Sequence, residues 1–209
     1  MILENVLPAE IEKRSMEIIC EELGEIRIDP EKIDIVKRVI HTSADFDYAR
    51  TLYFSENAVQ EGLAALKSGA TIVTDTNMAK AGINKAGMMK LGCTSVCYMA
   101  DEDVAQKASA EGWTRAAASM DKASKLQGPL IIAVGNAPTA LVRLAELIES
   151  GKINPSLIIA VPVGFVNVVE AKGIILRSNI PCIVARGRKG GSNVAAAICN
   201  ALIYRLTRS

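Results

Sequence analysis

The chain has 209 residues, half of them hydrophobic and 22% charged, and its formal net charge is +1. This composition is unlike that of a disordered chain, and the length favours one globular domain over residues 1–209. The balanced charge argues against a nucleic-acid partner, because phosphate binding needs clustered and unbalanced Lys and Arg. Aromatic residues make up only 4% of the chain, so platforms for stacking single-stranded bases are not expected either.

No targeting segment, disulfide framework or metal site is predicted. Charged residues run through residues 1–15, and no apolar run approaches the length of a bilayer-spanning helix. We therefore expect a cytoplasmic protein without a membrane partner. The five cysteines are odd in number and show no C-x-x-C spacing, and the chain has one histidine. These features favour buried thiols over disulfides or metal ligands.

The beginning of the chain, residues 1–69, is predicted to be mostly helical. A candidate helix over residues 31–40 places its apolar positions on one face. A second candidate over residues 56–67 follows Ser55, a residue type favoured at N-caps, and stops before Gly69.

Residues 70–209 instead alternate short apolar runs with helical segments. The runs do not alternate polar and apolar residues, which is typical of strands buried on both faces of a parallel sheet. They cover residues 70–74, 95–99, 130–134, 157–161 and 182–185. Helices are predicted between them, including residues 139–149 after Pro138 and a last helix that Ser192 could cap. This order predicts βαβ units and a three-layer α/β/α fold with a five-stranded parallel sheet.

The segments that follow the five predicted strands are rich in turn residues. In open parallel sheets, ligands bind beyond the carboxyl ends of the strands. Four of the segments contain Gly, Pro or Asn, and together they favour a binding site at that edge, although each alone could be an ordinary turn. The segments are residues 75–79, 100–103, 135–140, 162–165 and 186–192.

The last of these segments combines three glycines with Arg186, Arg188 and Lys189. Free N–H groups at a helix start and basic side chains would suit a carboxylate or a phosphate, while a basic, flexible turn is an equal alternative. The spacing matches neither the dinucleotide fingerprint G-x-G-x-x-G nor the P-loop pattern, so an ordinary nucleotide site is not expected.

His41 is the one histidine, and it closes the candidate helix over residues 31–40. Histidine is the side chain best suited to give and take a proton near neutral pH, but at a helix C-terminus it also complements the dipole. Arg38 lies on the same side of that helix, where it could bind an anionic substrate or pair with Asp34. No nucleophilic triad or zinc-hydrolase motif accompanies them.

Several long stretches resemble the precorrin-8 methylmutase family, whose members in the anaerobic branch of cobalamin synthesis are called cobalt-precorrin-8 methylmutases. The similarity runs nearly end to end and in the order of the family. The matching stretches are IEKRSMEII (11–19), VKRVIHTSADFDYA (36–49), IVTDTNMAKAGI (72–83), TRAA (114–117), VGNAPTAL (134–141), VPVGFVNVVEAK (161–172) and GRKGGSNVAAAICNAL (187–202).

The resemblance implies a flavodoxin-like fold, a homodimer and a methyl migration from C-11 to C-12 of a corrinoid tetrapyrrole, with or without cobalt. It implies no redox or nucleotide cofactor. By position, His41 matches the catalytic histidine of the family, and Ser15, Arg38 and Arg115 match positions at the substrate. The predicted binding edge adds further candidate substrate-binding residues: Thr76, Asn77, Asn136, Gly164, Arg188 and Gly190. Met78, Val163 and Phe165 are the expected apolar lining for a flat macrocycle.

Two other functions remain open at this point. A flavodoxin-like protein that holds flavin mononucleotide would need a phosphate-cradling loop after the first predicted strand, and residues 75–79 do not supply one. A corrinoid carrier would bind the product without turnover, so only turnover separates it from the isomerase.

Overall fold

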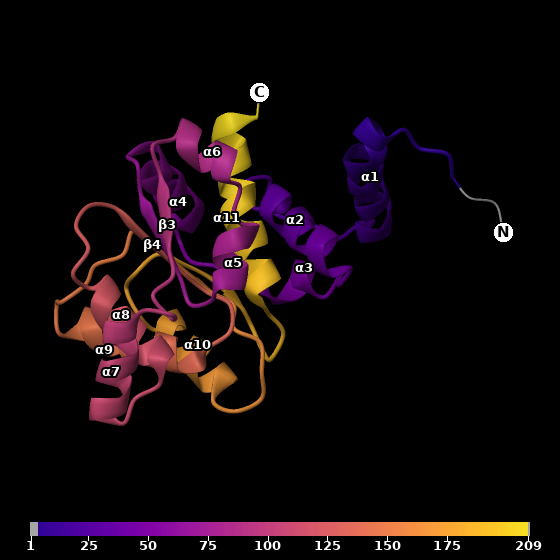
Figure 1. Cartoon of the computed structure of the whole chain (residues 1–209). Coiled ribbons are helices and arrows are strands. Elements are labelled where there is room, and N and C mark those ends of the chain that lie inside the picture. Colours follow the sequence, from indigo (N-terminus) through magenta and orange to yellow (C-terminus); the bar gives the residue numbers. More distant parts are fainter. Residues whose placement is uncertain (1–3, 209) are drawn as a thin grey trace.

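The computed structural model describes residues 4–208 and has a six-stranded sheet at its centre (Figure 1). The strands lie in the order β1-β6-β5-β4-β2-β3, and the five strands from β2 to β6 are parallel. The five parallel strands follow the flavodoxin-like order, in which the first lies between the second and the third. The strands are β1 (Leu52–Phe54), β2 (Thr71–Thr74), β3 (Thr94–Val96), β4 (Leu130–Val134), β5 (Leu157–Ala160) and β6 (Cys182–Ala185).

The predicted count of five strands was too low, because it omitted β1 within the part expected to be mostly helical. This edge strand has three residues and pairs antiparallel with β6, with Leu52 opposite Ala185. Three residues carry no periodic signal, so pairing with β6 decides their conformation. The strand predicted over residues 95–99 is also shorter, since β3 ends at Val96.

Helices cover both faces of this sheet, which confirms the three-layer α/β/α prediction. Neighbouring strand residues point to opposite layers: Ile72 packs in the cluster that includes α11, and Val73 packs in the cluster that includes α9. The first layer contains α1 (Ile11–Leu23), α2 (Ile33–Ser43), α3 (Tyr48–Thr51), α4 (Ala58–Lys67), α5 (Asn77–Gly82), α6 (Lys85–Lys90) and α11 (Ser192–Thr207). The second contains α7 (Glu102–Glu111), α8 (Arg115–Ala123), α9 (Pro138–Glu149) and α10 (Val168–Leu176) (Figure 1).

Within residues 4–208, no helix combines the length and the apolar character needed to cross a membrane. The five cysteines are free thiols, and four of them are buried. The same part of the chain contains no group of three or more His, Cys, Asp or Glu side chains placed to hold a metal ion.

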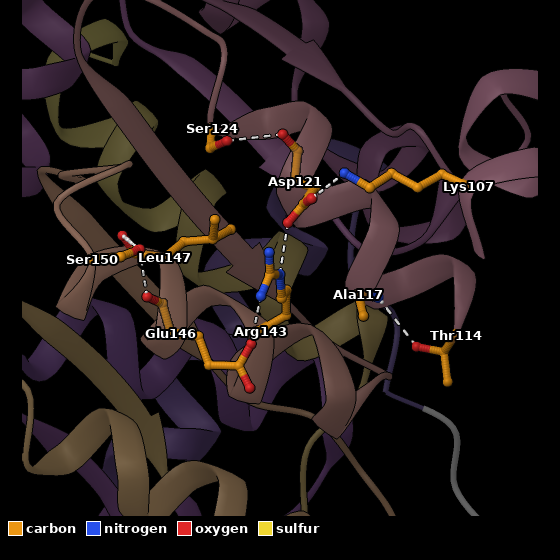
Figure 2. A network of polar contacts seen from close by, with 9 residues as sticks. All are labelled: Lys107, Thr114, Ala117, Asp121, Ser124, Arg143, Glu146, Leu147 and Ser150. Carbon is orange, nitrogen blue, oxygen red and sulfur yellow. Dashed lines mark hydrogen bonds and ion pairs between the residues drawn. The ribbon is translucent and has the colours of Figure 1, made fainter. Parts of the chain in front are cut away.

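Asp121 ties α7, α8 and α9 together in the second layer (Figure 2). One carboxylate oxygen accepts from Arg143 Nε at 2.6 Å, and the other accepts from Lys107 Nζ. Arg143 also reaches Glu146 at 2.6 Å, and the ring of Trp113 has the Arg143 and Lys107 cations 4.5 and 5.5 Å from its centroid. Burial works to raise the pKa of Asp121, but the hydrogen bonds from Arg143 and Lys107 outweigh it and lower that pKa.

We expect Asp121→Asn to lower the free energy of unfolding by about 2–3 kcal/mol at neutral pH, because two cations lose a largely buried partner. A carboxylate with a lowered pKa stabilises the fold above its unfolded pKa and loses that effect as the pH falls below about 4. Urea unfolding followed by the fluorescence of Trp113, the single tryptophan, measures the difference. Asp103→Asn is the control: Asp103 is 65% exposed in its pair with Lys122, so its loss should lower the free energy of unfolding much less than the loss of Asp121. Equal losses in the two variants would contradict the role of Asp121.

Candidate functional site

His41 lies in the last turn of α2, with its side chain exposed. The helix forms because its apolar residues recur at helical spacing and are buried against the first layer; they are Ile35, Val36, Val39 and Ile40. Ala44 ends the helix in the left-handed conformation and donates its N–H to Ile40 O at 2.7 Å. The helix is therefore anchored on one side and presents His41 on the other. It runs past the predicted end at residue 40, so that His41 belongs to the helix.

A hollow of about 520 Å³ opens between α2, α5 and α11, and His41 lines it. Its lining includes small residues from α5 and α11. A Cβ added to Gly82 would lie 2.9 Å from Ala196 Cβ, so these two helices pack closely. The lining residues are Arg38, His41 and Thr42 from α2, Met78, Ala81 and Gly82 from α5, and Asn193, Ala196, Ala197, Asn200 and Tyr204 from α11.

Arg38 joins this hollow to a second one of about 360 Å³, which also contains Lys37, Arg205 and Arg208. The Arg38 guanidinium lies 5.1 Å from the centroid of the Tyr204 ring and 2.7 Å from the carboxylate of Glu12 on α1. The pairing of Arg38 with Asp34 that the helical spacing suggested is wrong, because Asp34 pairs with Arg205 at 3.5 Å. Hydrogen bonding to Arg38 lowers the pKa of Glu12.

A buried carboxylate binds backbone N–H groups at the carboxyl edge of the sheet, between β2 and β4, where the strand order reverses. Asp75 follows β2 directly and is fully buried. Its two oxygens accept three N–H groups, from Gly135 and Asn136 at 2.8 Å and from Ala137 at 2.6 Å. Burial raises the pKa of this carboxyl, and the three N–H groups act in the opposite direction. Asp75 therefore fixes the loop that leads into α9.

The loop between β6 and α11, residues 186–191, is also held in place by close contacts with its neighbours. Gly190 lies so near the end of β5 that an added Cβ would be 2.1 Å from Val161 O, and Gly191 N–H donates to the same oxygen at 2.9 Å. Lys189 reaches across to Asp45 at 2.7 Å and Asp47 at 2.6 Å, in the turn that follows α2. Hydrogen bonds to Asp45 and Asp47 raise the pKa of Lys189.

The predicted site residues lie in several places, and their roles stay predictions. Arg38 and His41 share the hollow, together with Met78, whereas Val163 and Phe165 lie outside its lining. Ser15, on α1, donates its hydroxyl to Ile11 O within the helix.

The remaining predicted residues lie mostly at the carboxyl edge of the sheet. Thr76 caps α5 and bonds to the Ser192 hydroxyl at 2.7 Å, which joins α5 to the start of α11. Gly164 N–H donates to Arg188 O at 3.2 Å. Asn77 and Asn136 are exposed at this edge, and Gly190 lies in the loop already described. Arg115 is exposed at the start of α8 and does not line the hollow.

The sequence did not predict the residues that hold these loops, namely Asp75 and also Lys172 on α10, whose Nζ donates to Gly187 O at 2.8 Å and to Lys189 O at 2.9 Å. Asp75 follows a buried strand directly, but Asp is common in turns, so the sequence carried no distinct signal for its role. The sequence also did not predict Asn193, Asn200 and Tyr204 as lining residues of the hollow. Their spacing of seven and four nevertheless places them on one face of the last helix. Chemically, the hollow brings together the His41 imidazole, the Arg38 guanidinium, the Tyr204 phenol and several small apolar residues.

Comparisons with known proteins agree with this architecture. A family model described as precorrin-8X methylmutase matches residues 10–205. A cobalt-precorrin-8 methylmutase from Priestia megaterium is 44% identical over 197 residues, which cover 94% of this chain and 88% of that protein. A precorrin-8X methylmutase from Sinorhizobium sp. is 34% identical and is matched over 92% of each chain. The crystal structure of a precorrin-8x methyl mutase from Thermus thermophilus is 38% identical, covers 94% of this chain and 96% of its own, and has a TM-score of 0.86.

Proposed function

Because this chain belongs to the precorrin-8X methylmutase family, it is an isomerase of cobalamin biosynthesis, and we propose that it moves a methyl group from C-11 to C-12 of a precorrin-8-type macrocycle. The product is the corrin skeleton of hydrogenobyrinate or, with cobalt, of cobyrinate. The observation that carries the proposal is the hollow between α2, α5 and α11, where His41 lies beside Arg38 over a floor of small residues.

A methyl shift within one molecule needs no nucleophile, only a substrate held in its reactive shape and a changed electron distribution in the ring. His41 supplies the second requirement by giving a proton to a ring nitrogen, which withdraws electron density and favours the rearranged conjugation. Its exposure on the hollow side of α2 leaves it open to a bound macrocycle.

The cations and the hydrogen-bonded loops would hold the substrate in its reactive shape. A corrin precursor carries many carboxylate side chains. One of them would bind the guanidinium of Arg38, which lines the hollow. Arg188 and the exposed Asn136 offer further polar contacts from the carboxyl edge. The protein thus binds a multiply anionic substrate through local cations despite its net charge of +1.

Three further features belong to the same proposal. The substrate is a corrinoid with or without cobalt, since relatives named for both forms match the chain. The protein forms a homodimer, for which the exposed Val163, Phe165 and Val166 provide an apolar surface. It acts in the cytoplasm, which suits five free cysteines.

Absorbance of the purified protein mixed with metal-free or cobalt-loaded precorrin-8 tests the reaction. Conversion to the corrin chromophore supports the isomerase, and the faster of the two substrates identifies the branch. Binding without conversion of either substrate would point to a corrinoid carrier. A yellow chromophore in the purified protein would point to a flavin, although the N–H groups of the β4–α9 loop that could hold a phosphate are already bound to Asp75. Sedimentation at micromolar concentration tests the dimer.

A further inference from the structure

Lys172, on α10, is the largest of the side chains that the fold buries fully, with 1% of its surface exposed. Its ammonium forms no ion pair within residues 4–208, and burial lowers its pKa to about 8. A buried cation without a counter-ion costs free energy, and an apolar side chain of similar length would avoid that cost. The position therefore calls for a reason other than stability.

The partners of the ammonium supply that reason, because both belong to the loop over residues 186–191. Lys172 Nζ donates to Gly187 O at 2.8 Å and to Lys189 O at 2.9 Å. The carbonyl between them, Arg188 O, accepts from Gly164 N–H at 3.2 Å. Three successive carbonyls of the loop are thus held by hydrogen bonds, two of them by the buried ammonium, which a methylene group could not replace.

On its solvent-exposed side, the same loop contacts the turn that follows His41 and α2. Lys189, whose carbonyl is bound by Lys172, binds Asp45 and Asp47 through its side chain. Asp45 follows His41 by four residues, and its N–H donates to Ser43 Oγ at 3.3 Å in the last turn of α2. A continuous chain of polar contacts therefore runs from α10, through the loop, to the turn of α2 that carries His41.

We propose that Lys172 is a positioning residue for the methyl transfer. It fixes the β6–α11 loop from the side of α10, and that loop, through Lys189, determines the position of the turn that carries His41. The inference rests on the proposed function for its effect on turnover. Its structural part, the coupling of Lys172 to His41, stands independently of the reaction.

The test is Lys172→Met, which removes the ammonium and keeps most of the length of the side chain. We expect the thermal midpoint to stay level or rise, because a buried charge is removed, while turnover of precorrin-8 falls on the order of 10- to 100-fold. The single histidine offers a second readout: in protein labelled on the imidazole ring, the His41 cross-peaks in NMR spectra should move. Lys125→Met, at an exposed lysine near the opposite end of the sheet, should change neither readout.

Lys189→Met breaks the same chain of contacts from the solvent side and serves if Lys172→Met fails to fold. It should shift the His41 cross-peaks in the same direction and add little to the effect of Lys172→Met in the double variant. Wild-type turnover in Lys172→Met would overturn the proposal, as would a loss of activity that follows a fall in the thermal midpoint. If the wild-type protein converts no corrinoid, the proposed function fails, while the His41 cross-peaks still decide whether the coupling exists.

Discussion

Replacing His41 with alanine should lower kcat for methyl migration by about 10²–10⁴-fold, the usual contribution of a general acid or base. Binding of the corrin product should change little, because His41 is one of many residues around the hollow and Arg38 stays in place. Absorbance titration with the product and single-turnover conversion of precorrin-8 measure the two quantities separately. A loss confined to kcat is the signature of an interaction made only in the transition state.

Thr42→Ala is the matched control, since Thr42 is the next residue of α2 and lines the same hollow without a group that titrates near neutral pH. Its turnover should fall less than tenfold, as expected for the loss of one neutral hydrogen bond. Imidazole added to His41→Ala should restore part of the activity, because the hollow is open to solvent. If His41→Ala turns over at the wild-type rate, His41 only complements the C-terminus of α2, and the proton must come from another group.

The sequence predicted the parallel sheet well because its strands are buried on both faces. Residues 130–134 and 182–185 were predicted with the limits that the structure has. Such strands read as unbroken apolar runs, so their signal is local. β1 shows the opposite case, since three residues at an antiparallel edge depend on β6 for their conformation.

The candidate site was predictable only where a residue type carries its own chemistry. His41 and Arg38 were identified in this way and line one hollow. Long-range contacts decided the rest. Arg38 binds Glu12 from another helix in place of Asp34 one turn away. Lys172, in a helix of mostly apolar residues, would be expected to reach solvent, and only the folded loop reveals two carbonyls placed to receive its ammonium.

Gly190→Ala should remove most of the activity by displacing the β6–α11 loop. The added Cβ would lie 2.1 Å from Val161 O and 2.8 Å from Pro162 O, and both are backbone atoms that cannot rotate away. Either the loop or the end of β5 must move. We expect a loss of about 3 kcal/mol in the free energy of unfolding from overpacking. Turnover should fall on the order of 100-fold, because the moved loop carries Arg188 and, through Lys189, contacts the turn after His41.

Gly187→Ala is the control that separates the steric clash at Gly190 from the effect of any alanine substitution in this loop. Gly187 has φ +77° and open space around an added Cβ, so alanine there meets only the strain of the left-handed conformation, about 1–2 kcal/mol. Unfolding in urea and turnover of precorrin-8, measured on both variants, should show the smaller loss of each in Gly187→Ala. Similar losses in the two variants would mean that backbone strain, and not the close approach of Gly190 to Val161, limits the loop. Full activity in Gly190→Ala would instead show that the position of the loop does not matter for the reaction, and the route from Lys172 to His41 would lose its functional meaning.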